Sequence, residues 1–223
     1  MDGDNLISLS EKQELRFLEL VEKEPVMSQR HIASSMNIAI GLANALVKRV
    51  ARKGYIKIQE IPAKRYGYYL TPEGFGAKSR LVSKYLSDSL SFFRCAKEEY
   101  GSIAQAIREG GSNNVLCCGS GEVLEIARMV FNLYGITILA VVDPRHDEGE
   151  IQGLERVRDL DCFSPQILAT LGALVMTESS RPQMVYDTIC DMRDAAVAAK
   201  RCSASLRVLA PPFMKVTQSG AGI

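Results

Sequence analysis

The order of elements over residues 29–70 constrains the fold of this chain more than any other feature. Ser28 has a side chain suited to an N-cap, so a short helix is predicted over 29–36. Residues 37–39 predict a turn, and apolar residues at helical spacing predict a second helix from about 40 to 53. Two helices joined by three residues indicate a helix-turn-helix.

Two strands follow this pair of helices directly. Gly54 is suited to end the second helix, and the pattern of residues predicts strands over 55–61 and 66–70. The turn that joins the strands, residues 62–65, carries two cationic side chains. A basic hairpin in this place is the wing of a winged helix, which reaches phosphate groups or the minor groove of DNA.

A further helix precedes this motif. Ser10, followed three residues later by Gln13, has the pattern of a capping box at a helix start. Leu15 and Leu18 belong to an apolar stripe at helical spacing, and Pro25 is expected to end the helix. The N-terminal motif is therefore predicted to contain three helices and a wing.

Positive charge is concentrated in the same part of the chain. The whole sequence has a net charge of +1, but residues 30–84 contain 11 Lys and Arg and only two acidic residues. Clustered cations are typical of a surface that contacts phosphates, although a merely solvated surface has the same composition. The candidate contacts to DNA phosphates are Ser28, Gln29, Arg30, Arg49, Arg52, Lys57, Lys64 and Arg65.

The outward face of the helix at 40–53 is the candidate for base recognition. Asn can form two hydrogen bonds with adenine, Lys can reach guanine, and small apolar side chains can contact thymine methyl groups. Few polar residues lie on this face. Either DNA shape and the wing supply specificity, or the face contacts protein instead. The candidate base contacts are Leu42, Asn44, Ala45 and Lys48.

Four short motifs in this half point to a known family. They are Ser28-Gln29-Arg30-x-Ile32-Ala33, Gly41-x-x-Asn44, Lys53-Gly54-Tyr55-x-Lys57 and Tyr68-Tyr69-Leu70-Thr71-Pro72-Glu73-Gly74. With them the segment resembles MarR-type winged helices, and more narrowly the MarR-like regulators associated with bacterial exopolysaccharide gene clusters. The resemblance implies binding to double-stranded DNA, a homodimer and control of polysaccharide genes. Leu42 and Ala45 depart from the family, where a basic and a larger polar or aromatic residue are expected.

A long helix is predicted after the second strand, from residue 72 to about 108. A helix of about 30 residues spans about 45 Å, which is more than one small domain covers. We therefore expect a dimerisation helix, although a break near 87–89 would give two ordinary packed helices. Residues 109–114 predict a linker. The apolar residues near helical spacing are Leu81, Val82, Tyr85, Leu86, Leu90, Phe92, Phe93, Ala96 and Tyr100.

Strands and helices alternate in the second half of the chain. The predicted strands are 115–118, 137–142, 161–163, 173–177 and 206–209, and the predicted helices are 123–134, 164–171 and 181–200. Such alternation calls for a parallel sheet with helices on both faces. The fold class expected for the whole chain is an α+β winged helix-turn-helix followed by a small α/β Rossmann-like domain.

The turn after the first of these strands has the pattern Gly-x-Gly. Glycines there permit a tight turn and close approach of a phosphate to a helix N-terminus, and Asp143 lies where an acid would hold a ribose hydroxyl. Leu124 replaces the third glycine and Glu122 adds a negative charge, so a ligand-free structural domain remains an alternative. The candidate ligand-binding residues are Gly119, Ser120, Gly121, Glu122, Asp143, Ser179, Ser180 and Arg181.

Three resemblances meet in this half. The motifs are Gly119-x-Gly121-Glu122-Val123-x-Glu125-Ile126-Ala127, Ala140-Val141-Val142-Asp143 and Gly153. They resemble the Rossmann-like domain of some exopolysaccharide-type regulators, and are similar to the nucleotide-binding half of sugar acyltransferases and to CoA-binding domains. These likenesses imply a nucleotide or sugar-nucleotide ligand. The order of winged helix then Rossmann-like domain is also similar to that of Rex-type repressors, which implies NAD(H).

No catalytic or metal-binding constellation stands out. His146 lies in a loop and is expected to be exposed, and no cofactor is identified. The six cysteines contain no C-x-x-C pair, so they are expected to be buried thiols and no metal site is predicted.

No apolar run approaches the roughly 18 residues of a membrane span. The acidic start lacks the basic region of a secretory signal, so a cytoplasmic protein is expected.

These observations predict a DNA-binding transcription regulator that is not an enzyme. Its C-terminal domain would sense a small molecule or a partner. The alternatives are a protein-interaction scaffold with a degenerate winged helix and an NAD(H)-responsive redox regulator. The predicted divisions are a winged helix at 1–75, a connecting helix and linker at 76–112, a Rossmann-like domain at 113–210 and a tail at 211–223.

Overall fold

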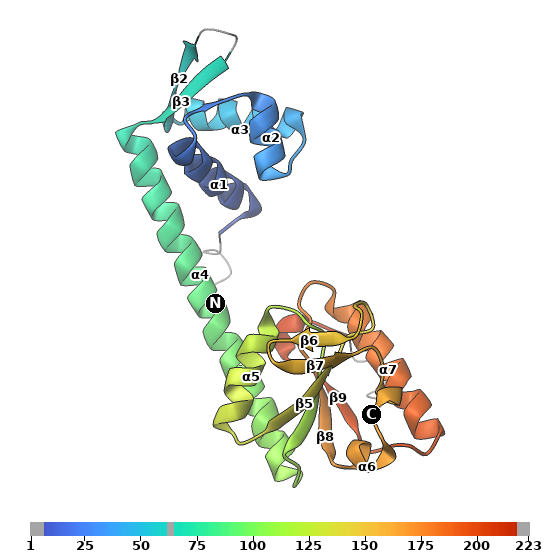
Figure 1. Ribbon diagram of the computed structural model, residues 1–223. Coiled ribbons are helices and arrows are strands. Elements are labelled where there is room, and N and C mark those ends of the chain that lie inside the picture. Colours follow the sequence, from blue (N-terminus) through green and yellow to red (C-terminus); the bar gives the residue numbers. More distant parts are fainter. Residues whose placement is uncertain (1–6, 62–64, 218–223) are drawn as a thin grey trace. The chain divides into compact units, whose positions relative to one another are not determined.

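The computed structural model describes residues 7–61 and 65–217. The chain forms two compact units, Met1–Ser91 and Phe92–Ile223 (Figure 1). Helix α4, Pro72–Glu109, contributes to both units because the boundary falls inside it. Each unit has a separate buried apolar core.

Helix α1, Leu9–Lys23, opens the first unit, and its N-cap is Ser8 instead of the predicted Ser10. The Oγ of Ser8 accepts from the backbone N–H of Glu11 (3.1 Å), and the Glu11 carboxylate accepts from the backbone N–H of Ser8 (2.7 Å). This carboxylate suits the positive end of the helix dipole better than the amide of Gln13. The hydrogen bond from the Ser8 backbone contributes most to lowering the pKa of Glu11 to about 2.

The predicted helix-turn-helix is present. Helix α2, Gln29–Met36, is capped by Ser28, whose Oγ accepts from the backbone N–H of His31 (3.1 Å). Asn37 ends α2 in the left-handed conformation (φ 53°), which asparagine tolerates well. Helix α3, Ile40–Arg52, follows after the short turn.

The wing is a three-stranded antiparallel sheet instead of a two-stranded hairpin. Its order is β1-β3-β2, with β1 at Val26–Met27, β2 at Ile56–Ile61 and β3 at Arg65–Leu70. Strand β1 pairs with Tyr66 and Gly67. It was missed because two residues are too few to show a period in the sequence.

The segment Thr71–Gly74, which leads from β3 into the first turn of α4, is held by close contacts. The Oγ1 of Thr71 donates to the carbonyl of Gly54 (2.5 Å) and accepts from the backbone N–H of Gly74 (3.0 Å). A Cβ on Gly74 would overlap the carbonyl of Tyr55. The glycine is therefore required here by the approach of the backbone.

Helix α4 is continuous through residues 87–89, so the predicted alternative of two helices is wrong. Ser89 stays within the helix, and its Oγ donates to the carbonyl of Tyr85 (2.9 Å). In the second unit α4 buries one face at helical spacing, formed by Ala96, Tyr100, Ala104 and Ile107.

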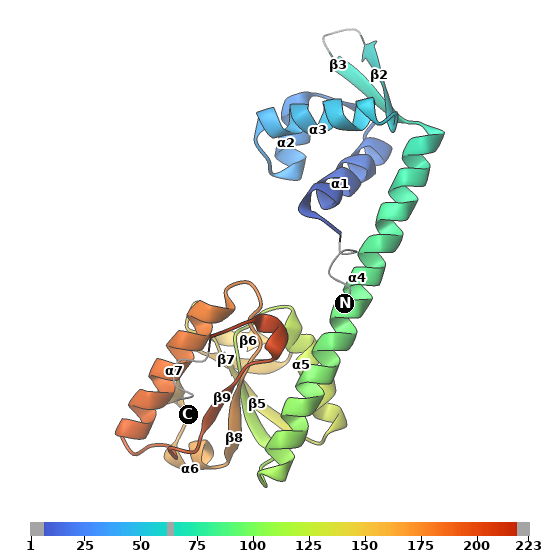
Figure 2. The same cartoon turned by 180° about the vertical axis from the view of Figure 1, so that it is seen from behind.

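The second unit has a six-stranded sheet in the order β6-β7-β5-β4-β8-β9, parallel except for β6. Right-handed crossovers place α5 and α7 on opposite faces, because β4–β5 and β8–β9 step in opposite directions along the sheet (Figures 1 and 2). The strands are β4 Asn114–Cys118, β5 Thr137–Val142, β6 Gly149–Ile151, β7 Leu154–Val157, β8 Leu171–Met176 and β9 Arg207–Leu209. The helices are α5 Val123–Leu133, α6 Pro165–Ala169 and α7 Pro182–Ala198.

Two predictions about this sheet are wrong. The expected strand at 161–163 is a turn of 3₁₀-helix, Leu160–Cys162, started by Asp159, whose side chain accepts from the backbone N–H of Asp161 (2.7 Å). The hairpin of β6 and β7 was not predicted. Its turn uses Gln152 and Gly153 at positive φ (52° and 74°), a pair that does not stand out as a turn signal.

The start of the C-terminal tail packs on the second unit. The short 3₁₀-helix Pro212–Met214 places the Phe213 ring 5.2 Å from that of Phe92 and 6.0 Å from that of Tyr100. The backbone N–H of Phe213 donates to the carboxylate of Glu99 (2.8 Å). The described part of the predicted tail, residues 211–217, thus packs on the second unit and covers part of α4.

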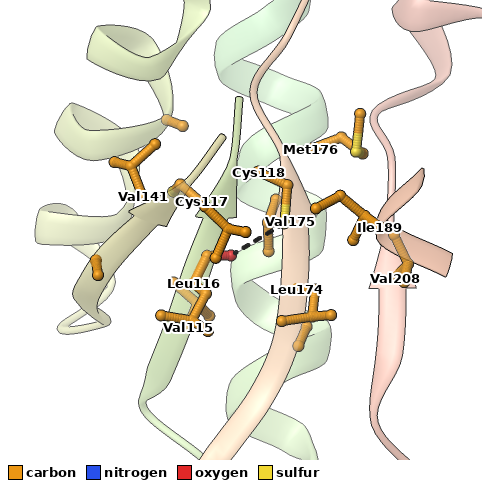
Figure 3. Close-up of a cluster of buried hydrophobic side chains, with 14 of the residues drawn as sticks. Val115, Leu116, Cys117, Cys118, Val141, Leu174, Val175, Met176, Ile189 and Val208 are labelled. Carbon is orange, nitrogen blue, oxygen red and sulfur yellow. Dashed lines mark hydrogen bonds between the residues drawn. The ribbon is translucent and has the colours of Figure 1, made fainter. Parts of the chain in front are cut away.

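The central strand β4 contains two adjacent cysteines whose side chains point to opposite faces of the sheet (Figure 3). Cys117 and Cys118 are both fully buried, as expected. Cys95 and Cys162 are exposed, so the prediction of buried thiols is wrong for them. Both lie at surface positions on a helix and a 3₁₀-turn, where the residue type does not by itself predict burial.

Candidate functional site

The outward face of α3 is where the sequence predicts it. Ala43, Leu46, Val47 and Val50 are buried against the first core. The opposite face is exposed and largely apolar, with Ile40 and Leu42 exposing 48% and 44% of their surface. The other exposed residues of the face are Gly41, Ala45, Lys48 and Arg52.

Asn44 is less accessible than expected. It is half-buried, and its Oδ1 is buried without a hydrogen-bond partner among the described residues. Pairing with adenine needs both the oxygen and the nitrogen of the amide. Asn44 therefore has to change rotamer before it can form the predicted pair.

Four predicted DNA contacts are exposed cations. They lie on α2, α3 and β2, and none forms an ion pair with any residue in the described ranges; they are Arg30, Arg52 and Lys57, together with the predicted base contact Lys48, whose charge also suits phosphate. Ser28 and Gln29 are exposed at the start of α2, where Ser28 is used as its cap. Lys64 lies outside the described residues, and only the backbone of Arg65 is described, as the first residue of β3.

Arg49 differs from the other predicted phosphate contacts. Its Nε lies 3.0 Å from Oε1 of Glu14, which is buried in α1. Lys53 donates to both carboxylate oxygens of Glu14 (2.7 and 2.9 Å). Arg49 and Lys53 thus together compensate the buried charge of Glu14, and Arg49 has an acidic partner that the other predicted phosphate contacts lack among the described residues.

In the second unit, the predicted residues Ser120 and Asp143 meet at the carboxyl ends of β4 and β5. Asp143 is fully buried. Its Oδ2 accepts from the backbone N–H of Ser120 (3.0 Å), from the Ser120 hydroxyl (2.5 Å) and lies 2.9 Å from Nδ1 of His146. His146 is exposed, as expected, but it is held by this contact.

Arg145 joins Asp143 to a second buried carboxylate, Glu178. Its Nε and Nη2 donate to the two oxygens of Asp143 (3.1 Å each), and Nη2 also donates to Glu178. Glu178 Oε1 accepts from the backbone N–H groups of Ser180 and Arg181 (2.5 and 3.4 Å). We call Ser120, Asp143, Arg145, His146 and Glu178 the polar cluster.

These hydrogen bonds keep both carboxylates charged. Burial alone would raise their pKa values, but for Asp143 the hydrogen bonds from Arg145 and Ser120 outweigh burial and lower the pKa. For Glu178 burial also opposes ionisation, and the hydrogen bonds from the Ser180 backbone and Arg145 lower the pKa. The cluster holds two negative charges and one permanent positive charge, so it does not favour a further anion.

The two glycines of the Gly-x-Gly turn are required by packing. Gly119 has φ +99°, and a Cβ on it would overlap Cβ of Glu178. A Cβ on Gly121 would lie 2.9 Å from the carbonyl oxygen of Thr177. Thr177 also donates through its hydroxyl to the carbonyl of Gly119. The turn therefore approaches the end of β8 closely, which explains the motif without a phosphate.

The side chains of the other predicted ligand residues form no described hydrogen bond with the cluster, although the backbone of Ser180 and Arg181 contacts Glu178. Glu122 is an exposed residue at the start of α5. Ser179, Ser180 and Arg181 are exposed. Arg181 is the N-cap residue of α7, and its side chain forms no capping hydrogen bond. The sequence places Glu178 directly after a predicted strand, among residues that could carry chemistry, but the predicted ligand set contains neither Glu178 nor Arg145. Arg145 lies three positions after a predicted strand and 33 positions before Glu178, so no local pattern joins the two.

Two further searches cover the described residues only. No group of His, Cys, Asp and Glu in this part of the chain is arranged to hold a metal ion. None of its helices is both long and apolar enough to cross a bilayer.

Comparisons with known proteins give distant similarities. No family model matches the sequence, and no curated protein is significantly similar to it. The chain is similar to the PcaV transcriptional regulator of Streptomyces coelicolor (22% identity, TM-score 0.35, 41% of this chain). It is also similar to MepR, a transcription regulator of the Staphylococcus aureus multidrug efflux pump MepA (17% identity, TM-score 0.34, 39% of this chain). The matches span 63% of each regulator.

A third similarity extends over more of the chain. Human N-acetylserotonin methyltransferase, solved in complex with SAM, matches 90% of this chain and 75% of its own at 12% identity, with a TM-score of 0.30. At these scores the likenesses do not define the fold. The winged helix and the α/β sheet are defined by the order and pairing of their own elements.

Proposed function

We propose that the protein is a transcription regulator that binds double-stranded DNA through α3 and the wing. The observation that carries this proposal is the set of exposed cations around the helix-turn-helix, Arg30, Lys48, Arg52 and Lys57, that have no acidic partner among the described residues. Such charges suit phosphate groups on either side of a groove. We expect double-stranded DNA because a helix-turn-helix inserts its second helix into a major groove.

The apolar surface of α3 would restrict how bases are read. Ile40, Leu42 and Ala45 can contact thymine methyl groups, whereas Lys48 is the one cation at the middle of the helix face. Specificity would therefore come largely from DNA shape and from wing contacts.

A homodimer is part of the proposal. Leu86, Leu90 and Phe93 of α4 are exposed by 54%, 57% and 38% and lie at i, i+4 and i+7, on one face of the helix. Pairing of two such faces would bury this apolar surface and would place two winged helices on one duplex. The target genes would be those of polysaccharide synthesis, as the sequence resemblance implies.

Binding to DNA is tested by fluorescence anisotropy across a salt series. The duplexes are the region upstream of the gene, regions upstream of polysaccharide genes and a random sequence. We expect preference for one natural duplex, two protomers per duplex and a steep salt dependence. Lys48→Gln and Arg52→Gln should each reduce the slope of log K against log salt by about 0.9, because each removes one phosphate contact.

Lys200→Gln is the matched control, since Lys200 is an exposed lysine in the other unit. It should leave both affinity and slope unchanged. Equal slopes for all three variants would show that α3 does not contact phosphates. Weak binding that is equal on every duplex would contradict the regulator and would favour the scaffold.

The scaffold alternative rests on the exposure of Ile40 and Leu42. Leu42→Lys separates the two cases. It should strengthen DNA binding several-fold, because it adds a cation to the face that meets phosphates and bases, whereas Leu42→Asp should weaken it. The measurement is again anisotropy with the preferred duplex. If neither variant alters DNA affinity, this face of α3 does not meet DNA.

Sensing of a small molecule by the second unit is also proposed. The ligand would have to favour one placement of the DNA-binding units energetically. A nucleotide or sugar nucleotide at the Gly-x-Gly turn would have to displace Ser120 or Arg145 from Asp143, since these groups occupy both oxygens of the carboxylate.

We therefore expect millimolar NADH or UDP-glucose to leave the melting temperature of the full chain unchanged, as measured by a thermal-shift assay. The reference is a buffer of the same ionic strength that contains neither compound. A saturable rise of the melting temperature with either compound would show that the polar cluster opens for a ligand. A rise with UDP-glucose would support sensing of a sugar nucleotide, and a rise with NADH would support the redox alternative.

A further inference from the structure

Two hollows of the second unit meet at the amino ends of β4 and β8, at the edge of the sheet opposite the polar cluster, and the second extends from there to Val157 at the end of β7. The first has a volume of about 800 Å³ and lies between the end of α4 and the starts of β8 and β9. The second, of about 650 Å³, lies between the starts of β4 and β5, the end of β7 and helix α6. Asn114 and Thr170 line both hollows, so the two are neighbours.

The first hollow is polar and carries one positive charge. None of its lining residues is acidic, and Arg207 is its one charged residue. Arg207 is exposed and forms no ion pair with the residues that the structure describes. Ser112, Asn114 and Thr170 contribute hydroxyl and amide groups to the same lining.

The carbonyl groups that face this hollow already accept hydrogen bonds. The backbone N–H groups of Gly111 and Ser112 donate to carbonyls of the last helical turn (2.9 and 3.4 Å). The Ser112 hydroxyl donates to the carbonyl of Thr170 (2.8 Å). The guanidinium of Arg207 is therefore the charged donor that the lining offers to a ligand.

The second hollow is apolar in its interior. Leu139, Val157, Phe163 and Ile167 line it, and Ile167 is 41% exposed. Glu155 is the one charged residue of its lining. An anionic group is repelled there, so a ligand that spans the two hollows has its negative end toward Arg207.

We propose that this edge of the sheet binds an amphipathic carboxylate, with the carboxylate on Arg207 and the apolar body in the second hollow. A single guanidinium matches a carboxylate through two parallel hydrogen bonds and balances its one charge. A phosphate dianion would need a second cation, which the lining does not supply. The proposal does not depend on DNA binding by the first unit.

Isothermal titration of the full chain with octanoate tests this proposal. We expect saturable binding of one octanoate per chain. Arg207→Gln should weaken it about tenfold or more, which corresponds to the loss of one charge-assisted contact. Ile167→Gln should weaken octanoate and also 1-octanol, whereas Arg207→Gln should leave the weaker binding of 1-octanol unchanged.

Lys200→Gln is the matched control, because Lys200 is an exposed cation of the same unit that forms no ion pair with the described residues. It should bind octanoate as the unaltered chain does. The absence of saturable binding, or equal affinity in the Arg207→Gln variant, would overturn the proposal. If inorganic phosphate binds at this site as tightly as octanoate does, the apolar body does not contribute to binding, and its placement in the second hollow is wrong. Circular dichroism and the melting temperature of Arg207→Gln check that the variant folds as the unaltered chain does.

Discussion

Arg145→Gln is expected to lower the free energy of unfolding of the second unit by about 3–5 kcal/mol, because it leaves two buried carboxylates without their shared cation. Arg145 contributes three of the hydrogen bonds to Asp143 and the one ion pair of Glu178; the backbone bond alone survives the substitution. The measurement is hydrogen exchange in β4 peptides of the full chain, which reports this unit separately.

The effect should depend on pH in a direction set by the lowered pKa values. Asp143 and Glu178 ionise more readily in the folded chain than in the unfolded one, so their contribution to stability is present above about pH 4 and is lost as the pH falls below it. The difference between Arg145→Gln and the unaltered chain should thus be constant from pH 6 to 8 and smaller in acid.

Arg158→Gln is the control for a surface ion pair. Arg158 lies 3.5 Å from Asp147, and both side chains are exposed. Its loss should change stability by less than about 1 kcal/mol. A similar small effect for Arg145→Gln would show that the carboxylates are protonated or solvated, and that the polar cluster is not the ionised network described above.

Gly119→Ala is expected to cost about 3 kcal/mol or more. Two costs add: a non-glycine residue at φ +99°, and the overlap of the new methyl group with Cβ of Glu178. The strain falls on the same turn that supplies Ser120 to Asp143. Urea denaturation of the full chain, followed by hydrogen exchange in β4, measures the effect.

Gly153→Ala separates the two costs, because Gly153 also has positive φ (+74°) but no atom lies within 4 Å of an added Cβ. It should lose only about 1 kcal/mol. If the two alanine variants lose equal stability, the glycine at 119 is needed for its backbone conformation alone. The close approach to β8 would then not explain the motif.

Local patterns predicted the helix-turn-helix well. The N-cap Ser28, the turn at Asn37 and the apolar face of α3 all depend on residues within one or two helical turns of each other. The period of the sequence reports such neighbours directly. The same reasoning predicted the central strands β4, β5 and β8, which are short buried runs.

Contacts between distant positions were not predictable in this way. Arg49 and Lys53 lie 35 and 39 positions after Glu14, so no local pattern shows that they compensate a buried carboxylate. Arg145 and Glu178 likewise meet because two strand ends share one edge of the sheet. As a result, Arg49 was assigned to phosphate, and the cation that joins Asp143 to Glu178 was left out of the candidate site.

The adjacent free cysteines of β4 can report how often the sheet of the second unit opens and exposes this strand. Burial raises the pKa of both Cys117 and Cys118, so neither forms the reactive thiolate while the sheet is intact. Cys95 and Cys162 are exposed and Cys190 and Cys202 are half-buried, so these four thiols are expected to be alkylated first. The rate at which the last two labels are then incorporated would measure how often β4 separates from the sheet. The unaltered chain suffices for this measurement, because both thiols are native.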